Sequence, residues 1–361
     1  MTVTVTAGTA VRIYPAESLK DGHAFQSISN VGAPLWDTYT TKGGGRAETW
    51  HPRFSYHGFR YLELTGLPAG ATVSVRGKVL HTHNTSAGSF TSSNELINGT
   101  HGLIRRALQG NMMTILTDCP SREKLGWLEQ NQLVFPTLAA NYDMRAYLRK
   151  IVRDMADAQT TEGLIPSTVP DYVELAGGYR NDANWGGAFV LVPWQLYTTY
   201  GDEETPRTYY PRMKQYVTFL EQKVGYWRVV DGLSRIARVL GEDDDAALYR
   251  EKADTSAKAL SDKYYDPATG TFGGGGHGAE ALALDMGAVP EGERARLLDH
   301  FTRSVVAADH HLILSEISLP TAIRVLSESG RDDIVYGIAT WTTSPSYGHQ
   351  VLAGNTTLGE T

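Results

Sequence analysis

A short run of the chain, residues 117–130, gathers the residue types that perform sugar chemistry. Asp118, Arg122, Glu123 and Trp127 lie close together within it. Carboxyl groups can act as acid and base, and an arginine can hold a neighbouring carboxylate ionised. An indole face can cover the apolar side of a pyranose and exclude water. The pattern therefore predicts a site that cleaves glycosidic bonds.

The same run also has a purely structural interpretation. Asp118 would cap a helix, Arg122 and Glu123 would form a solvated ion pair, and Trp127 would belong to the core. On composition alone, this interpretation of an acidic cluster is favoured. The decision between the two depends on other segments of the chain.

Residues 118–127 read Asp-Cys-Pro-Ser-Arg-Glu-Lys-Leu-Gly-Trp. This run resembles the Asp-Cys-Pro-x-Arg-Glu-x-Leu-Gly-Trp signature of bacterial and fungal α-L-rhamnosidases, glycoside hydrolase family 78. Further segments are similar to that family in the same order, namely residues 50–61, 90–94, 164–166, 184–188 with 192–194, and 345–348 with 354–360. Because several separated motifs agree, we expect the chain to share the fold and chemistry of that family.

The resemblance implies cleavage of terminal α-L-rhamnosyl residues with inversion. Glu123 matches the family's general acid, and Glu360, in the element Thr-Thr-Leu-Gly-Glu, matches its general base. Inversion requires the two carboxyl groups to lie about 6.5–9.5 Å apart, with a water molecule between them. Asp118 would bind sugar hydroxyls, and Arg122 would hold Asp118 or another acid in orientation.

Other positions of the resemblance suggest substrate contacts. Trp127 would form an apolar wall for the methyl group of rhamnose. Trp185 would add a second wall, or it would pack in the barrel, and packing is the favoured interpretation for Trp194. Many relatives have an aspartate where this chain has Gln130, whose amide can bind a hydroxyl but carries no charge.

His310, His311 and Glu316 are of metal-ligating types, but they lack the i, i+4 spacing of a helical zinc site. Relatives have a His-x-Leu element near the substrate in this segment. The favoured interpretation of His311 is a packed loop, followed by sugar contact and then by metal binding. We expect no metal and no cofactor, and the glycine-rich residues 273–278 lack the strand and helix of a dinucleotide site.

The composition limits the partners that the protein can bind. The chain has 361 residues and a formal net charge of −7, without the basic surface that nucleic acids or anionic membranes require. The single cysteine, Cys119, excludes an internal disulfide and is expected to behave as a small buried apolar residue rather than a nucleophile. The N-terminus has no signal-peptide pattern and no segment is apolar enough to span a membrane, which favours a cytoplasmic protein, although a longer parent chain can be exported.

Residues 1 to about 90 alternate apolar and polar side chains, as in residues 2–5 and 61–64, and contain Gly and Pro turns. A period of two predicts strands, so we expect a small antiparallel β-sandwich domain over residues 1–90. Within it, residues 71–75 and 77–83 are expected to form one hairpin.

From about residue 94 the apolar period becomes helical. Met144, Leu148, Ile151 and Met155 form one stripe, and residues 213, 217 and 220 form another. We expect further helices near residues 187–200, 229–240, 245–263, 291–306, 317–328 and 331–341. Helices paired by short connections predict an α/α toroid, a six-hairpin-type barrel, over residues 91–361.

Two departures from the family pattern suggest that this barrel is incomplete. Between Val224 and Leu233 the chain is shorter than its relatives, so we expect it to lack one helix. Relatives also continue beyond Thr361 and begin before Met1. The chain therefore resembles a family member that is shortened internally and truncated at both ends.

Two alternatives to an active rhamnosidase remain open. One is a catalytically impaired remnant that binds rhamnose, and the other is a different α/α-barrel enzyme such as a polysaccharide lyase. In each case the partner is a small-molecule or oligosaccharide ligand. The aglycone, the linkage and the oligomeric state are not predicted.

Overall fold

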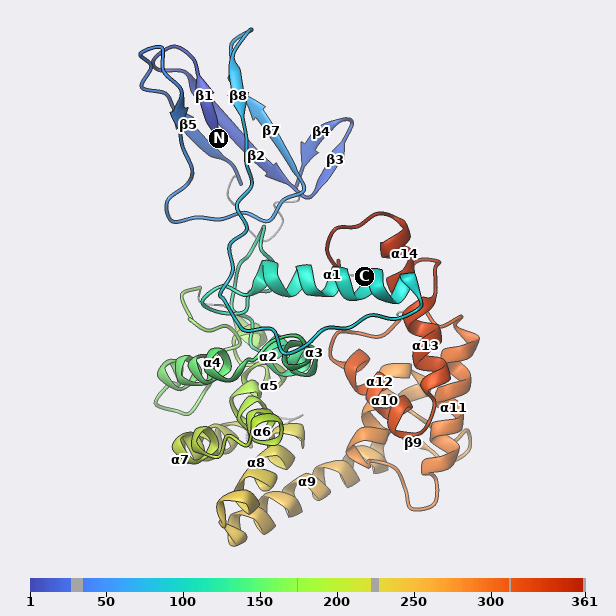
Figure 1. Cartoon of the computed structure of the whole chain (residues 1–361). Coiled ribbons are helices and arrows are strands. Elements are labelled where there is room, and N and C mark those ends of the chain that lie inside the picture. Colours follow the sequence, from blue (N-terminus) through green and yellow to red (C-terminus); the bar gives the residue numbers. More distant parts are fainter. Residues whose placement is uncertain (27–34, 174, 222–226, 312, 360–361) are drawn as a thin grey trace. The chain divides into compact units, whose positions relative to one another are not determined.

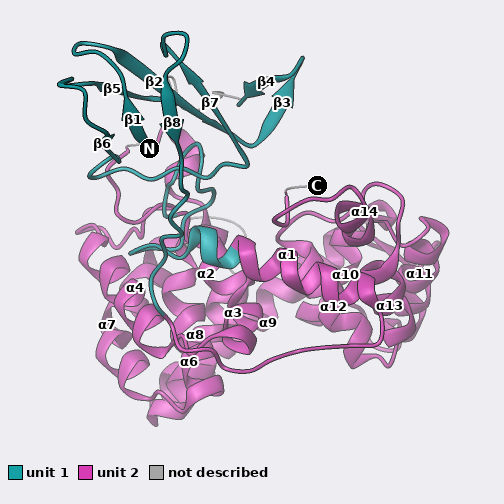
Figure 2. Cartoon of the chain, turned by 45° about the horizontal axis from the view of Figure 1, so that its top comes forward, with its two compact units in different colours: residues 1–83, 108–126 teal, residues 84–107, 127–361 magenta. Residues whose placement is uncertain are grey.

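The computed structural model covers residues 1–361 and describes all of them except residues 27–34, 174, 222–226, 312 and 360–361. The chain forms two compact units, which Figure 2 shows in different colours. Residues 1–83 and 108–126 form the first, the strand unit, and residues 84–107 and 127–361 form the second, the helical unit. Because these units are discontinuous in sequence, the domain boundary expected near residue 90 stays a prediction.

Small antiparallel sheets make up the strand unit (Figure 1). One has the order β6 (Glu48–Thr49), β1 (Thr2–Thr4), β8 (Thr72–Ser74), another the order β5 (Asp37–Thr40), β2 (Ala10–Ala16), β7 (Tyr61–Thr65), and β3 (Ser18–Lys20) pairs with β4 (His23–Phe25). In β2, Val11 is fully buried while Ala10 and Arg12 are exposed. This alternation is the period of two that predicted strands here.

The hairpin expected between residues 71–75 and 77–83 is wrong. β8 pairs instead with β1, where Val73 lies opposite Val3. Val3 is fully buried, so this pairing supplies β8 with an apolar neighbour on the same face of the sheet. Residues 77–83 form no strand, and Thr82 donates its backbone N–H to the carbonyl of Met112, 2.6 Å away.

The helical unit contains most of the helices (Figure 1). The helices of the chain are α1 (Glu95–Asn111), α2 (Glu129–Leu133), α3 (Phe135–Asn141), α4 (Arg145–Ala158), α5 (Ala183–Gly186), α6 (Ala188–Tyr200), α7 (Glu204–Leu220), α8 (Trp227–Leu240), α9 (Asp243–Tyr264), α10 (His277–Met286), α11 (Arg294–Ala307), α12 (Ser318–Glu328), α13 (Asp332–Thr340) and α14 (Tyr347–Leu352). The helices expected between residues 187 and 341 are confirmed, with ends that differ by a few residues.

The apolar stripes identified in the sequence are also confirmed as core. Met144, Leu148 and Met155 are fully buried, and Ile151 is 3% exposed. Residues 213, 217 and 220 of α7 are buried in the same way. These stripes pack α4 against α6 and α7, because each helix buries its one apolar face against a neighbour.

Short connections make consecutive helices run in opposite directions. Residues 201–203 join α6 to α7, residues 241–242 join α8 to α9, and residues 329–331 join α12 to α13. In the α/α toroid expected from the sequence, alternate helices run the same way, so we expect α6, α8, α10, α12 and α14 to begin at one end of the helical unit. We call this end, where the connections lead into these helices, the entry end.

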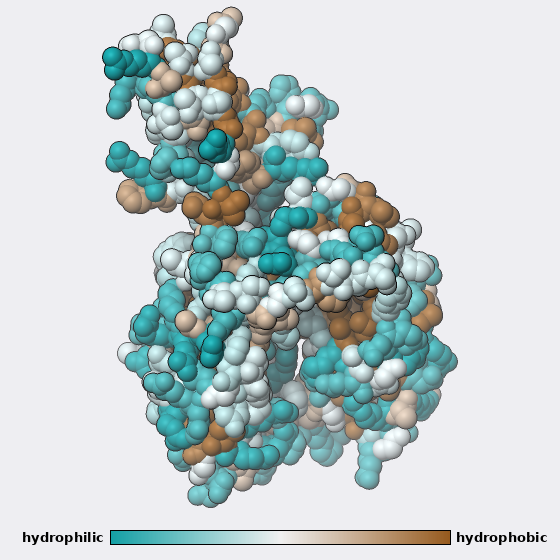
Figure 3. All heavy atoms as spheres, in the orientation of Figure 1, coloured by the Kyte–Doolittle hydropathy of each residue, from teal (hydrophilic) through white to brown (hydrophobic). Residues whose placement is uncertain are grey.

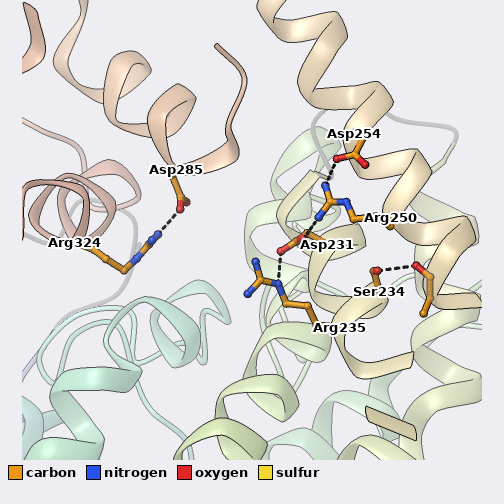
Figure 4. A network of polar contacts seen from close by, with 8 residues as sticks. Asp231, Ser234, Arg235, Arg250, Asp254, Asp285 and Arg324 are labelled. Atoms are coloured by element: carbon orange, nitrogen blue, oxygen red, sulfur yellow. Dashed lines mark hydrogen bonds and ion pairs between the residues drawn. The ribbon is translucent and has the colours of Figure 1, made fainter. Parts of the chain in front are cut away.

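Charged residues join neighbouring helices of this unit, as Figure 4 shows. Asp231 of α8 is almost buried and accepts from Arg235, 2.8 Å away, and also from Arg250 of α9. Arg324 of α12 binds Asp285 of α10 across 2.7 Å. A buried carboxylate is stable only when it is paired in this way, so the network holds α9 on α8 and α12 on α10.

The outward faces of the helical unit are largely hydrophilic in the view of Figure 3. Helix α9 illustrates this, since most of its charged side chains are exposed and only its small or aromatic residues are buried. Among the described residues, no helix combines the length and the apolar character that crossing a membrane requires.

Candidate active site

The run 117–126 forms a closed turn in the strand unit. Asp118 donates its backbone N–H to the carbonyl of Leu125 across 3.0 Å, and its Oδ1 accepts from the Leu125 N–H at 2.9 Å. No helix begins at Asp118, so the helix-cap interpretation is wrong. The two bonds join both ends of the turn that carries Arg122 and Glu123, and we call residues 118–125 the acid turn.

Cys119 supports the acid turn from inside. Its side chain is buried, and its Sγ accepts the backbone N–H of Glu123 across 3.2 Å. Burial raises the pKa of the Cys119 thiol, and the nearby charge of Asp118 adds to this effect. Because the thiol and not the thiolate is favoured, Cys119 holds the turn in shape and is not set up as a nucleophile.

Lys124 adopts a left-handed backbone conformation, with φ of 55°. For a residue with a side chain this costs roughly 1–2 kcal/mol, so other contacts must stabilise it. Its Nζ donates to the carbonyl of Tyr56 across 2.5 Å and lies 4.7 Å from the centre of the Tyr56 ring. Burial lowers the pKa of Lys124. The contacts with Tyr56 thus fix the backbone directly after Glu123.

The acid turn brings the two carboxyl groups of the motif into electrostatic contact. Burial raises the pKa of the Asp118 carboxyl, and the charge of Glu123 raises it further, while hydrogen bonds from Cys119 and Leu125 act in the opposite direction. Arg122 and Glu123 are both partly buried, so they do not form a fully solvated pair. Interacting acids in a partly desolvated turn are able to hold different protonation states.

Trp127 and Trp185 meet in the helical unit. Their ring centres lie 6.1 Å apart at an interplanar angle of 66°, an edge-to-face arrangement. Trp127 forms an isolated β-bridge with Thr168, and the next residue, Leu128, donates its N–H to Ser167 across 2.9 Å. Both indoles are partly exposed, so they form an apolar corner that a ligand can reach.

Gly186 allows Trp185 to occupy this corner. A Cβ at Gly186 would lie 2.5 Å from the hydroxyl oxygen of Tyr216 and 2.8 Å from the carbonyl oxygen of Ile165. Both distances are shorter than any real contact, and the carbonyl belongs to the backbone. The short helix α5 can therefore dock here only with glycine next to the tryptophan. Asp182 caps it by accepting the Asn184 N–H at 2.8 Å.

Gln130 lies on α2, one turn after Trp127, and is partly buried. Sequence reasoning missed its neighbour Gln132, whose amide donates to the carbonyl of Asn184 and so ties α2 to the helix of Trp185. The carbonyl of Gln132 in turn accepts from Gln195 of α6 across 2.9 Å. A glutamine in a short polar helix has no pattern in the sequence that indicates such a role.

His311 lies in the connection between α11 and α12. Its Nδ1–H donates to the carbonyl of Ala308 across 3.0 Å, and its Nε2 accepts from the Trp341 indole N–H at 3.2 Å. The Thr343 hydroxyl lies 2.8 Å from the same Nε2. Both ring nitrogens are thus engaged within the protein. The described residues contain no group of three or more His, Cys, Asp or Glu side chains arranged to bind a metal ion.

The predicted base, Glu360, lies outside the described residues. The segment before it is attached to the helical unit. The N–H of Gly359 donates to Gln350 Oε1 of α14 across 2.8 Å, and Leu358 donates to Leu103 of α1 at 3.3 Å. The carbonyl of Thr356 accepts from Arg106, also on α1. The chain is therefore held between α1 and α14 up to the residue that precedes Glu360.

The structure thus groups the predicted site residues in three places. Asp118, Arg122 and Glu123 share the acid turn of the strand unit. Trp127, Gln130 and Trp185 lie together in the helical unit, and His311 lies on another connection of that unit, next to Trp341.

Comparison with known families identifies both parts of the chain. The family described as bacterial alpha-L-rhamnosidase 6 hairpin glycosidase domain matches residues 85–228 and 220–361. The bacterial alpha-L-rhamnosidase concanavalin-like domain matches residues 1–81. The six-hairpin helical barrel and the small antiparallel β domain before it, both expected from the sequence, are thereby confirmed.

Individual relatives support the same assignment. An alpha-L-rhamnosidase of Streptomyces avermitilis is 32% identical over 98% of this chain, which covers 37% of that protein. The structure of an alpha-L-rhamnosidase from Dictyoglumus thermophilum superimposes with a TM-score of 0.89 at 30% identity. The superposition covers 99% of this chain and 44% of the Dictyoglumus chain.

The crystal structure of the Streptomyces avermitilis alpha-L-rhamnosidase complexed with L-rhamnose superimposes with a TM-score of 0.88 at 31% identity. This superposition covers 99% of this chain and 37% of the Streptomyces chain. The chain therefore spans about two fifths of the length of these relatives. Since the six-hairpin family matches most of its residues, the chain belongs to the bacterial α-L-rhamnosidase six-hairpin glycosidase family.

Proposed function

We propose that this chain carries the catalytic machinery of an inverting α-L-rhamnosidase, which hydrolyses terminal α-L-rhamnosyl residues from glycosides. The acid turn is the observation that supports this most directly. In this turn the backbone N–H of Glu123 donates to the buried thiol of Cys119, and Glu123 interacts with the carboxyl group of Asp118. The next residue, Lys124, has a strained left-handed backbone. Such strain is typical of functional sites.

In this mechanism Glu123 donates its proton to the glycosidic oxygen as the bond from that oxygen to the anomeric carbon breaks. The aglycone leaves as an alcohol, and positive charge develops on the sugar ring. Glu360 removes a proton from a water molecule that attacks the opposite face, so the product is β-L-rhamnose. Asp118 binds sugar hydroxyls, and Arg122 orients Asp118.

Two tryptophans supply the apolar contacts in this proposal. Trp127 and Trp185 form the corner that receives the methyl group of rhamnose, with Gln130 available as a hydrogen-bond partner for a hydroxyl. Supporting this role, the two indoles are partly exposed and Gly186 is required for their approach. The role of His311 in substrate binding stays a prediction from the sequence, since both of its ring nitrogens are engaged within the protein.

The test is hydrolysis of 4-nitrophenyl α-L-rhamnoside by the full chain, with the anomeric form of the fresh product followed by NMR. We expect β-L-rhamnose first. Glu360→Ala should lower turnover roughly 10²–10⁴-fold, and added azide should restore part of it by forming β-L-rhamnosyl azide. Glu328→Gln, a change at an exposed glutamate on α12, is the control. Initial formation of α-L-rhamnose, or full activity of Glu360→Ala, would contradict the mechanism.

A second candidate is a rhamnose-binding protein without efficient turnover. One observation favours it, namely that the six-hairpin family matches in two segments that overlap at residues 220–228. This overlap includes part of the region that the sequence resemblance predicts to be shortened. Quenching of tryptophan fluorescence by L-rhamnose without hydrolysis of the aryl rhamnoside would support it. The relatives described above are all rhamnosidases, so no observation favours a polysaccharide lyase.

A further inference from the structure

One tryptophan that the mechanism does not use is held on several sides. The ring of His310 lies 5.7 Å from the Trp341 ring at an interplanar angle of 37°, and the ring of His311 lies 6.0 Å away at 83°. The Nε2 of His311 accepts the indole N–H of Trp341 and also lies 2.8 Å from the hydroxyl of Thr343. We call His310, His311, Trp341 and Thr343 the indole clamp.

The hydrogen bonds of His311 determine its tautomer. A backbone carbonyl only accepts, so Nδ1 must carry the proton that goes to Ala308. An indole nitrogen only donates, so Nε2 must be the acceptor that orients Trp341. The neutral Nδ1–H form satisfies both bonds at once. The role of His311 in this arrangement is therefore to set the direction of the Trp341 ring.

Several features of this arrangement are unfavourable to the free energy of folding. Asp309 and His310 are consecutive residues with left-handed backbones, with φ of 54° and 57°. The Nδ1 of His310 is buried and has no hydrogen-bond partner within the described part of the chain. A Cβ on Gly337 would lie 2.5 Å from the His310 ring, so the ring needs a glycine on α13. Strain of this kind persists mainly where function requires it.

Packing of Trp341 in the core does not explain why these unfavourable features are present. Trp341 is partly exposed, and it is absent from the partly buried side chains that pack on the apolar core of α10–α13, where Tyr347 is present. A structural tryptophan would normally add its large apolar area to that core. An indole that is oriented by a dedicated histidine and left partly open is better suited to contact a ligand.

The position of the clamp fits a ligand that reaches beyond one sugar. Residues 341–346 lead into α14 and residues 308–317 lead into α12, and the bond between His311 and Trp341 joins the two connections. In a six-hairpin barrel, connections into alternate helices lie at one end, here the entry end. Trp185 precedes α6 at the same end. Trp127 and Trp185 already form the two walls of one corner, which leaves a third indole for a second ring.

We propose that Trp341 binds the ring to which the rhamnose is attached, and that His311 is a positioning residue that holds the indole for this contact. The ligand chemistry is a flat apolar face, from either a pyranose or an aryl aglycone. Stacking on an indole recognises such a face without requiring particular hydroxyl groups. This inference rests on the proposed rhamnosidase function.

The test follows single tryptophans by ¹⁹F NMR in the full chain labelled with 5-fluorotryptophan, in the Glu123→Gln background to prevent turnover. Trp127→Phe, Trp185→Phe and Trp341→Phe assign the three signals. The probes are L-rhamnose, methyl α-L-rhamnoside, 4-nitrophenyl α-L-rhamnoside and a disaccharide with rhamnose at its non-reducing end. We expect the first two to move only the Trp127 and Trp185 signals, and a ring-bearing probe to move the Trp341 signal as well.

If the Trp341 signal moves with the aryl rhamnoside alone, Trp341 binds an aryl ring. If it also moves with the disaccharide, Trp341 binds a pyranose ring as well. If Trp127 and Trp185 respond and Trp341 responds to neither ring-bearing probe, the inference is overturned while the proposed function stands. An equal response of Trp341 to free L-rhamnose overturns it too, because the indole would then belong to the rhamnose pocket. If none of the three signals responds, the proposed function fails and the inference fails with it.

Kinetics separate positioning from folding in chains with Glu123 intact. His311→Phe and Trp341→Ala should raise KM for 4-nitrophenyl α-L-rhamnoside roughly tenfold, with kcat nearly unchanged, since an aromatic contact accounts for about one factor of ten. His311→Gln, whose amide oxygen can accept the indole N–H, should recover part of the loss. His349→Phe, at an exposed histidine of α14, is the matched control. A wild-type KM in His311→Phe would overturn the positioning role.

Discussion

The acid turn and the indole clamp solve the same problem in different units of the molecule. Each positions a side chain with left-handed residues that are not glycine, Lys124 in the turn and Asp309 with His310 in the clamp. The turn closes within eight residues, whereas the clamp joins residues thirty positions apart, His311 and Trp341. The turn contains interacting acids, whereas the clamp is built from ring contacts and hydrogen bonds. Backbone strain is thus common to both features, and interacting acids are particular to the turn.

The largest expected effect tests the acid turn. Glu123→Gln keeps the shape of the side chain but removes the proton that the leaving oxygen needs, so turnover of a rhamnoside with an alkyl leaving group should fall roughly 10²–10⁴-fold. The loss should be smaller for 4-nitrophenyl α-L-rhamnoside, whose leaving group needs little protonation. Steady-state kinetics on both substrates provide the measurement. Equal losses on both would show that Glu123 is not the acid.

The next effect concerns the corner formed by Trp127 and Trp185. Gly186→Ala forces a methyl group against the Ile165 carbonyl, and we expect a loss of about 1–3 kcal/mol in the free energy of unfolding, together with weaker rhamnose binding. Urea unfolding measures the free energy of unfolding, and fluorescence titration measures the affinity for rhamnose. Gly178→Ala, at a nearby exposed glycine with open space around it, should change neither. Similar behaviour of both variants would mean that the corner does not depend on close packing.

A smaller effect should come from the anchor of the acid turn. Lys124→Met keeps the length of the side chain but loses the hydrogen bond and the cation–π contact with Tyr56, so stability should fall by about 1–2 kcal/mol. Turnover should fall as well, because the strained backbone next to Glu123 is then free to relax. Thermal unfolding with kinetics measures both, and Lys78→Met, at an exposed lysine of the same unit, is the control. Loss of stability with unchanged kcat would separate the anchor from catalysis.

The smallest effect is a pH dependence at Asp118. Because burial raises its pKa in the folded protein, the folded state binds the proton more tightly than the unfolded chain does. This group therefore reduces stability as pH rises from its ordinary value near 3.8 through the raised value. Asp118→Asn should be more stable than the wild type at pH 7, and the difference should shrink towards pH 4. Thermal melts across this range check the sign, and a difference that grows on acidification would refute it.

Local patterns determined much of this protein in advance. The stripe from Met144 to Met155 encodes a helix with one buried face, because apolar residues at helical spacing must point the same way. The acid turn was recognisable for a similar reason, since Asp118, Arg122, Glu123 and Trp127 lie within one run of the chain. The family follows from the same run together with the motifs that surround it.

Only the tertiary structure decided which distant segments meet. The sequence offered residues 77–83 as the partner of β8, whereas the structure pairs β8 with β1, where Val73 lies opposite the fully buried Val3. His311 and Trp341 meet because α12 and α13 bring the chain back beside the connection that follows α11. Alternation and helical spacing describe how one element buries its own face, but a contact across thirty residues depends on the path of the whole chain between them.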